Sequence, residues 1–206
     1  MRSNFFANAK TLLGSRPVNF ATTNNMDFIR ENITFAITSF TLLSNILFIL
    51  FFVLFLSSNS FRQKTYTVVN KNILGFLFVT SLGALVGSLT YSNIAGFPPC
   101  ELCWIQRIFM YPQVILSFMA MIKKDKGIVF YLFPLSILGA IVSFYHSMAQ
   151  WGFGGSLLPC TAVGGECSKV YVLEYGYITI PFMAFTSFIY LIAISAIYFK
   201  SRKVEV

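Results

Sequence analysis

Residues 33–56 read ITFAITSFTLLSNILFILFFVLFL, and this run decides the class of the fold. Its 24 residues include no charged side chain, and about 20 apolar residues are enough for a helix to cross a bilayer. Four more segments have a similar character: residues 73–93, 102–122, 128–148 and 177–199. Only 11% of the chain is charged and its mean hydropathy is +0.72, whereas soluble domains carry roughly 25% charged residues. The sequence therefore predicts an all-α, polytopic integral membrane protein.

The formal net charge of +8 is unevenly distributed along the chain. Positive residues cluster between the apolar segments at Arg62, Lys64 and Lys71, at Lys123, Lys124 and Lys126, and at Lys200, Arg202 and Lys203. The alternate connections, residues 94–101 and 150–176, contain only Lys169. Because basic loops stay on the cytoplasmic side, these two poor loops are predicted to face outward. The positive charge thus reports topology and contact with membrane lipid, and it does not indicate nucleic-acid binding.

The order of segments predicts four regions along the chain. Residues 1–32 form a polar N-terminal tail, residues 33–56 an extra transmembrane helix, residues 73–199 a four-helix bundle, and residues 200–206 a basic cytoplasmic tail. The links between the bundle helices are short, which favours antiparallel packing of sequence neighbours. Gly83 and Gly87 form a small-xxx-small pair, and we expect it to let two helix backbones approach closely.

All four cysteines lie in the two outward loops. Cys100 and Cys103 form a Cys-x-x-Cys pair in the first loop, and Cys160 and Cys167 lie in the second. Disulfides persist on the extracytoplasmic side of a membrane, so this location suits disulfide chemistry. The spacing of the first pair fits a redox-active disulfide and half of a zinc site equally well. A helix start near Glu101 would place Cys103 in a first turn, where a thiolate is favoured.

Three polar residues lie near the Cys-x-x-Cys pair in the predicted bundle. Arg107 follows Cys103 by four residues, which places both on one helical face about 6 Å apart along the axis. A buried arginine in a membrane usually has a partner, and a bound electron-rich ligand such as a quinone carbonyl would provide one. The alternatives are snorkelling or pairing with Glu101. His146 is predicted to lie at a similar depth on another helix, and it could bind the same ligand. The alternative role of His146 is a purely structural hydrogen bond. Gln106 is a further candidate for binding the ligand.

The second cysteine pair lies in a longer, glycine-rich loop that directly follows the helix with His146. A disulfide between Cys160 and Cys167 could be a static staple of this loop. Because glycines give the loop backbone freedom, it could instead approach the first pair. Two neighbouring pairs can pass electrons by thiol–disulfide exchange.

Several motifs occur together in the order of a known family. The runs CELCWIQR (100–107), FYHSMAQ (144–150), Cys160 preceded by proline and followed by Cys167, and YGYITIPFM (175–183) resemble the disulfide bond formation protein B family. The short-loop branch often called BdbC is the most similar. The resemblance covers residues 73–199, and the extra helix at 33–56 departs from the four spans typical of the family.

The resemblance implies a thiol:quinone oxidoreductase in a bacterial plasma membrane, with its cysteine loops outside. Such a protein reoxidises a thioredoxin-fold thiol oxidase and passes the electrons to ubiquinone or menaquinone. Cys100 and Cys103 would be the pair near the quinone, and Cys160 and Cys167 the shuttle pair, with Cys160 forming the mixed disulfide to the partner. Arg107 and His146 match residues near the quinone, and a freed Cys103 thiolate beside Arg107 would donate to it.

Two other functions remain open at this point. A quinone reductase similar to the vitamin K epoxide reductase family also uses a Cys-x-x-Cys beside a quinone, but the order of the two cysteine pairs is then reversed. A non-enzymatic membrane protein with a structural four-cysteine site would hold zinc or inert disulfides and would not need Arg107. We expect the redox enzyme, with no bound metal.

Overall fold

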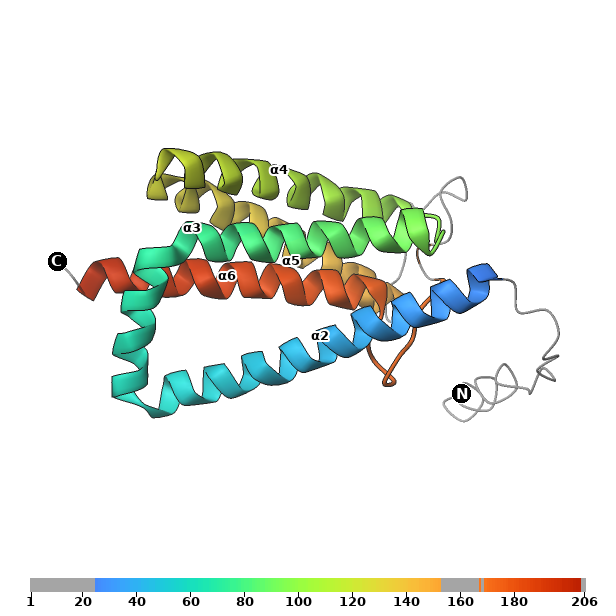
Figure 1. Ribbon diagram of the computed structural model, residues 1–206, viewed down its shortest axis with the longest axis horizontal. Helices are drawn as coiled ribbons and strands as arrows, with labels where there is room; N and C mark the ends of the chain where they lie inside the picture. Colours follow the sequence, from blue (N-terminus) through green and yellow to red (C-terminus); the bar gives the residue numbers. More distant parts are fainter. Residues whose placement is uncertain (1–24, 153–166, 168, 205–206) are drawn as a thin grey trace.

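The computed structural model describes residues 25–152, 167 and 169–204, most of which are helical (Figure 1). The long helices are α2 (Asn25–Ser57), α3 (Asn59–Leu89), α4 (Glu101–Lys123), α5 (Val129–Gln150) and α6 (Ile180–Val204), with a π-helical turn at Thr90–Ile94 and a 3-10 turn at Lys126–Ile128. All five long helices have the length and hydropathy needed to cross a membrane. The predicted all-α membrane fold is therefore confirmed.

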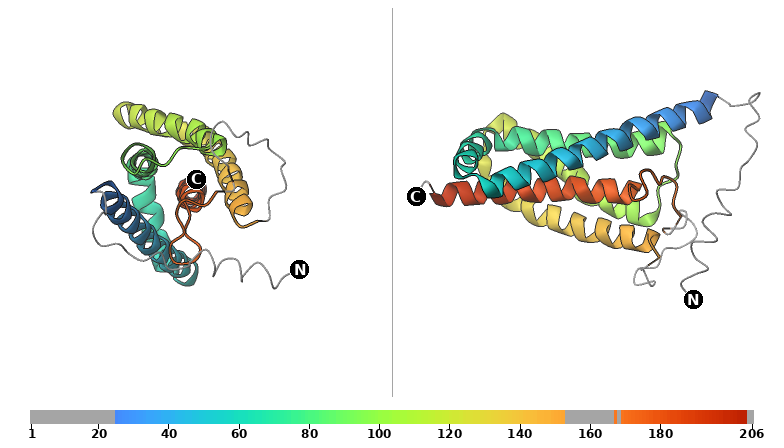
Figure 2. Two further views of the ribbon diagram at one scale, coloured as in Figure 1. Left: turned by 90° about the vertical axis from the view of Figure 1, so that its right-hand side faces the viewer. Right: turned by 90° about the horizontal axis from the view of Figure 1, so that it is seen from below.

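Helices α3 to α6 form an antiparallel bundle in which α6 occupies the middle. In the end-on view, α6 is surrounded by α3, α4 and α5 on one side and α2 on the other (Figure 2). The tightest packing joins α5 to α6, where a Cβ atom added to Gly139 would overlap the ring of Phe188. Phe188 is fully buried, so a glycine is needed at this contact for the two helices to pack.

The predicted close approach at Gly83 and Gly87 is wrong. A Cβ atom added at either position would meet no atom within 4 Å. Both glycines instead line an internal cavity between helices. The close helix contact of the fold is made at Gly139 instead.

The segment between the first two spans is helical, although the sequence predicts a non-helical link there. Ser58 caps the start of α3 by accepting a hydrogen bond from the N–H of Phe61, and the helix bends at Asn72, which has non-helical backbone angles. Before the bend, α3 runs across the end of the bundle (Figure 1). Its buried residues Tyr66 and Val69 recur at helical spacing, so this part is an amphipathic helix without a long apolar run.

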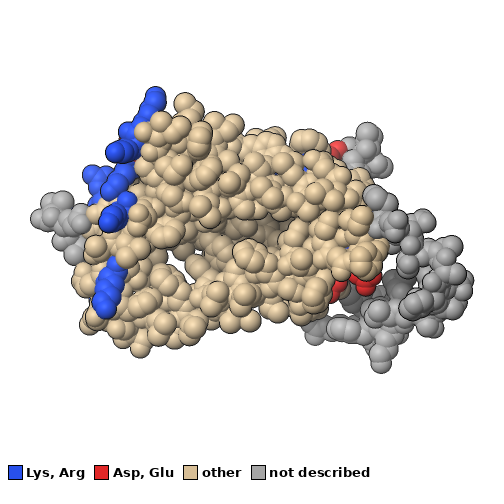
Figure 3. Space-filling model, in the orientation of Figure 1, with Lys and Arg blue, Asp and Glu red and all other residues tan. Residues whose placement is uncertain are grey.

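The two ends of the molecule differ in charge. Lysine and arginine side chains gather at the end where α6 finishes (Figure 3), and the start of α4 with Cys100 lies at the opposite end (Figure 1). This asymmetry agrees with the predicted orientation of the bundle. The sidedness itself stays a prediction.

Candidate active site

A cavity of about 460 Å³ lies between the helices and extends to the start of α4. Six of the seven residues predicted for the site line it: Cys100, Cys103, Gln106, Arg107, His146 and Cys167. The seventh, Cys160, lies outside the described residues. Residues from α4 with its N-cap, from α5 and from the loop with Cys167 are thus brought together, although up to 67 positions separate them in sequence.

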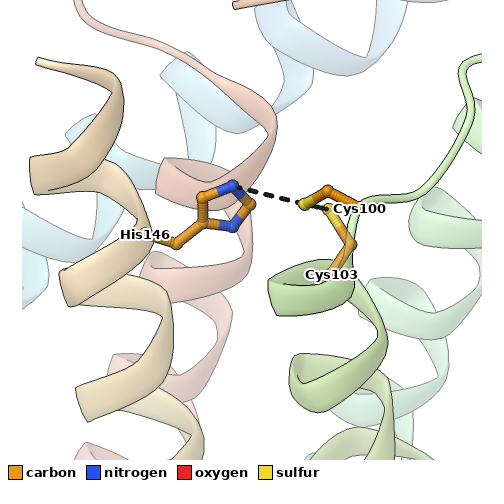
Figure 4. Close-up of side chains that lie close together, drawn as sticks. All are labelled: Cys100, Cys103 and His146. Carbon is orange, nitrogen blue, oxygen red and sulfur yellow. Dashed lines mark hydrogen bonds between the residues drawn. The ribbon is translucent and has the colours of Figure 1, made fainter. Parts of the chain in front are cut away.

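The Cys-x-x-Cys pair lies at the junction of an extended segment and a helix. Pro98 and Pro99 keep the preceding chain extended, and Cys100 caps α4 with φ −75° and ψ 172°. The helix begins at Glu101, as predicted. The Sγ atoms of Cys100 and Cys103 lie 3.0 Å apart and share a hydrogen bond (Figure 4). The two sulfurs are close enough to exchange between a dithiol and a disulfide, and they are not bonded to each other in this structure.

His146 approaches the pair from α5 and is 1% exposed. Its Nε2 atom lies 3.5 Å from Sγ of Cys100 (Figure 4), and its Nδ1 atom lies 2.9 Å from Nε2 of Gln106. An amide nitrogen can only donate, so with this amide orientation Nδ1 accepts and the imidazole proton lies on Nε2. Gln106 thereby orients a neutral histidine that donates to the sulfur of Cys100.

These contacts determine which sulfur is ionised. The pKa of Cys100 is lowered from its ordinary value to about 4, chiefly by the hydrogen bond from the Cys103 thiol. Burial acts in the opposite direction, and the hydrogen bond from His146 adds to the lowering. The sequence favours a thiolate on Cys103, whereas the structure favours Cys100, because the hydrogen bonds with Cys103 and His146 both lower the pKa of Cys100.

Arg107 is buried beside the cavity at 7% exposure and does not snorkel to the surface. Its Nε donates to Oγ of Ser88 at 3.0 Å, and Nη2 donates to the Ser88 carbonyl at 3.0 Å and to Oγ of Ser92 at 2.9 Å. The guanidinium also lies over the Trp104 ring, 5.1 Å from its centroid. Among the described residues, Nη1 has no hydrogen-bond partner. Two N–H donors are therefore left for a ligand.

Cys167, a member of the second cysteine pair, lies beside the first pair. It is buried in one apolar cluster with Cys100 and Leu102, and it is disulfide-bonded. The predicted pairing with Cys160 falls outside the described residues and stays a prediction. Packing of the loop cysteine against the cluster of the membrane pair supports exchange between them.

Three further polar residues belong to the site but were not predicted from the sequence. Ser88 at the end of α3 and Ser92 in the π-helical turn that follows both hold Arg107. Their spacing of four residues could have indicated this, since it places them on one helix face. Gln150 follows His146 by one turn and donates to the Lys169 carbonyl at 3.1 Å. Its Oε1 atom is buried without a hydrogen-bond partner, alone among the side chains of the described part of the chain. An unpaired buried acceptor is costly and suits a ligand hydroxyl.

The same residues could also bind a metal ion. One ligand atom each from Cys100, Cys103 and His146 lies within 4.8 Å of the others. A structural zinc site needs a fourth ligand, and the sulfur of Cys167 is already in a disulfide. The arrangement thus fits thiol redox chemistry more completely than a closed zinc site.

Comparison with known proteins agrees with this geometry. Residues 70–198 match the family described as disulfide bond formation protein DsbB. Disulfide bond formation protein C of Bacillus subtilis (strain 168) is 43% identical over 140 residues, which cover 66% of this chain and 99% of that protein.

Two further relatives have similar coverage. A probable disulfide formation protein C of Halalkalibacterium halodurans is 35% identical over 64% of this chain and 96% of its own length. The SPbeta prophage-derived disulfide bond formation protein B of Bacillus subtilis is 37% identical over 66% of this chain and 91% of its own length. No solved structure matches the chain.

The family match covers more than half of the chain and includes every cysteine, whereas α2 lies before it. With five helices able to span a bilayer, this is a multi-pass membrane protein of disulfide formation and a disulfide-forming oxidoreductase. The chain belongs to the disulfide bond formation protein DsbB family.

Proposed function

We propose that this protein is a thiol:quinone oxidoreductase that reoxidises an extracytoplasmic thioredoxin-fold dithiol oxidase. It thereby supports disulfide formation in exported proteins. The observation that carries the proposal is the Cys100–Cys103 pair, which lines a cavity beside Arg107 and is packed near the disulfide-bonded Cys167.

The cavity has the features that a quinone requires. Its volume of about 460 Å³ lies in the usual range for small-molecule sites. A quinone carbonyl accepts hydrogen bonds, and Nη1 of Arg107 has two N–H groups to donate. The buried Oε1 of Gln150 is an acceptor that suits a hydroxyl of the reduced product. When bound, a quinone accepts two electrons and two protons and supplies the oxidising power.

The cysteines act as a relay of two disulfide exchanges. A thiolate of the partner attacks the Cys160–Cys167 disulfide, and its second thiolate releases the mixed disulfide, so that the partner is oxidised and the loop pair reduced. A thiolate of the loop pair then attacks the Cys100–Cys103 disulfide in the same way. The loop disulfide is restored and two electrons reside on the membrane pair.

The polar residues each have a defined task in this state. His146 donates from Nε2 to Cys100 and keeps the thiolate on that sulfur. Gln106 holds the histidine in the required tautomer. Arg107, fixed by Ser88 and Ser92, is placed to donate to a carbonyl oxygen and to stabilise the negative charge that develops there.

The proposed location is a bacterial plasma membrane, with the basic end in the cytoplasm and the cysteine loops outside. Ubiquinone and menaquinone both fit the described chemistry. A vitamin K epoxide reductase-like enzyme would use the same site in the opposite direction, reducing the quinone at the expense of a dithiol donor.

Steady-state turnover of the purified protein tests the proposal. A reduced thioredoxin-fold oxidase serves as donor, and quinone absorbance reports the product. We expect turnover in the wild type, and we expect Cys100→Ser and Cys160→Ser each to abolish it while thermal unfolding stays near that of the wild type. No turnover with ubiquinone or menaquinone, together with one bound zinc ion per chain, would instead support the structural four-cysteine site.

A further inference from the structure

Helix α2 lies outside the region that matches the family, yet it forms one wall of the redox cavity. Four of its residues line the cavity: Ile37, Phe40, Thr41 and Ser44. Their spacing of three and four residues places them on a single face of the helix. The rest of α2 is largely exposed, so this face is where the helix meets the bundle.

Specific side-chain contacts hold α2 in this position. The hydroxyl of Tyr190 on α6 donates to Oδ1 of Asn45 and lies 3.2 Å from Oγ of Ser44. The Tyr190 ring also packs on Phe48, with centroids 4.6 Å apart. At the outer end, Nε of Arg30 donates to the Ala95 carbonyl at 2.6 Å. The helix is thus attached at two levels.

Between these attachments, Ile37 of α2 packs on the cluster of Tyr91, Ala95 and Val172, and the same face of α2 borders the cavity. The surface is hollowed between α2 and α6 on the face shown in Figure 3. Across the cavity, α3 presents Gly83 and Gly87, whose missing side chains would meet no atom within 4 Å. The cavity is therefore a slot between one face of α2 and one face of α3, and the small residues lie on the α3 wall.

The slot is too long for a quinone ring alone. Its lining extends from Val79 on α3 to Ser92 in the π-helical turn that follows, which is roughly 20 Å of helix at 1.5 Å per residue. Its upper end contains Arg107 and the two membrane cysteines, and its lower end contains Ser44 and Tyr190. The exposed lining is mainly apolar. An apolar chain attached to a ring at the upper end fits this shape and polarity.

We propose that α2 closes the side of the slot over the isoprenoid side chain of the quinone and so makes the site selective for quinones that carry one. This inference rests on the proposed function, because it assumes a quinone ring at the redox end. The residues that determine the selectivity are Thr41 on α2 and Gly83 on the opposite wall.

The test compares binding of quinones with and without a side chain. Quenching of intrinsic tryptophan fluorescence reports binding, since Trp104 lies against Arg107. The probes are menadione, which has no side chain, and a menaquinone with four isoprene units, with the corresponding ubiquinones as a second set. Quinone retained by the purified protein, extracted and quantified, gives an independent readout.

Two variants narrow the slot, and each has a matched control. Thr41→Phe projects a ring from α2 into the slot; the Thr41 hydroxyl bonds only to the Ile37 carbonyl of its own helix, so its loss exposes no unpaired partner elsewhere. Leu43→Phe is the control on the exposed side of α2. Gly83→Leu fills the slot from α3, and Gly75→Leu is its control, since Gly75 is equally open but does not line the cavity.

We expect Thr41→Phe and Gly83→Leu to weaken binding of the long-chain quinone by about tenfold or more and to leave menadione binding nearly unchanged. Both controls should bind both quinones like the wild type. Equal weakening for the two quinones, or no weakening, would overturn the role of α2 while leaving the proposed function intact. If the wild type binds neither quinone of either set, the proposed function fails and the inference fails with it.

Discussion

Helices α4 and α2 both cross the apolar zone, but they are held in different ways. In the most apolar stretch of α4, 39% of the residues are buried, against 6% in α2. Helix α4 is tied to its neighbours by the buried side chains of Arg107 and Gln106, whereas α2 depends on a few contacts such as Tyr190 with Asn45. Removing a contact of α4 should therefore lower the rate of quinone reduction. Removing a contact of α2 should change which quinones bind.

Replacing Arg107 tests the α4 side of this comparison and should give the largest effect. We expect Arg107→Ala to lower kcat for quinone reduction by about 10²- to 10³-fold, as found when a donor to developing negative charge is removed. Arg107→Lys should not restore the rate, because an ammonium cannot bond Ser88 and Ser92 in the same planar geometry. Arg62→Ala, at the basic end, is the control. A kcat of Arg107→Ala within about threefold of the wild type would exclude a role in charge stabilisation.

The packing of α5 on α6 should give the next largest effect, on stability. Gly139→Ala forces a methyl group into the Phe188 ring, and overpacking of this kind costs about 1–3 kcal/mol. Gly75→Ala should be neutral or stabilising, because its added methyl meets no atom and alanine favours helix by up to about 1 kcal/mol. Thermal unfolding in detergent measures both. If the two variants shift the midpoint equally, the close contact at Gly139 is not part of the fold.

The pKa of Cys100 tests the contact between the start of α4 and His146 on α5. Its pKa of about 4 is depressed, so the thiolate stabilises the reduced fold at neutral pH, and this stabilisation is lost as the pH falls through about 4. In His146→Ala the pKa should rise toward its ordinary value. The ultraviolet absorbance of the thiolate, followed against pH in the reduced protein, measures this change.

Ser147→Ala is the matched control for that titration. Ser147 is buried on the same helix, but its hydroxyl bonds only to the Ser143 carbonyl. Its titration curve should match that of the wild type. An unchanged curve in His146→Ala would mean that the histidine does not stabilise the thiolate.

The attachment of α2 should give the smallest effect. Asn45→Leu and Tyr190→Phe each remove one side of the contact between α2 and α6. A double-mutant cycle on unfolding should give a coupling of about 0.6 kcal/mol, the average for such hydrogen bonds in membranes. Reduction of menadione should be unaffected in all three variants. Loss of that activity would show that α2 supports the redox end itself.

Much of the fold was predictable because each span is a local property of the sequence. Five apolar runs predict five helices, and the start of α4 follows from Pro98 and Pro99. The helical segment before Asn72 was not predicted, because an amphipathic interfacial helix contains charges such as Arg62 that resemble a loop. Helix lengths and boundaries therefore follow from composition only where the helix is buried in lipid.

The site was predictable where its residues share a helix. Cys103 and Arg107 are one turn apart, so their proximity follows from helical spacing alone. The contacts of Arg107 with Ser88 and Ser92 and the thiolate on Cys100 depend on how separate helices meet, which spacing does not reveal. The wall formed by α2 depends in the same way on the rotation of that helix about its own axis.

The most direct test of the account is a single turnover of the membrane pair alone. The double variant Cys160→Ser, Cys167→Ser retains only Cys100 and Cys103; it would be reduced, freed of reductant and mixed with quinone in the absence of oxygen. The account predicts one quinol and one Cys100–Cys103 disulfide per chain, measured by quinone absorbance and by thiol titration. A reduced pair that persists while the quinone stays oxidised would contradict the claim that electrons leave the protein through these two sulfurs.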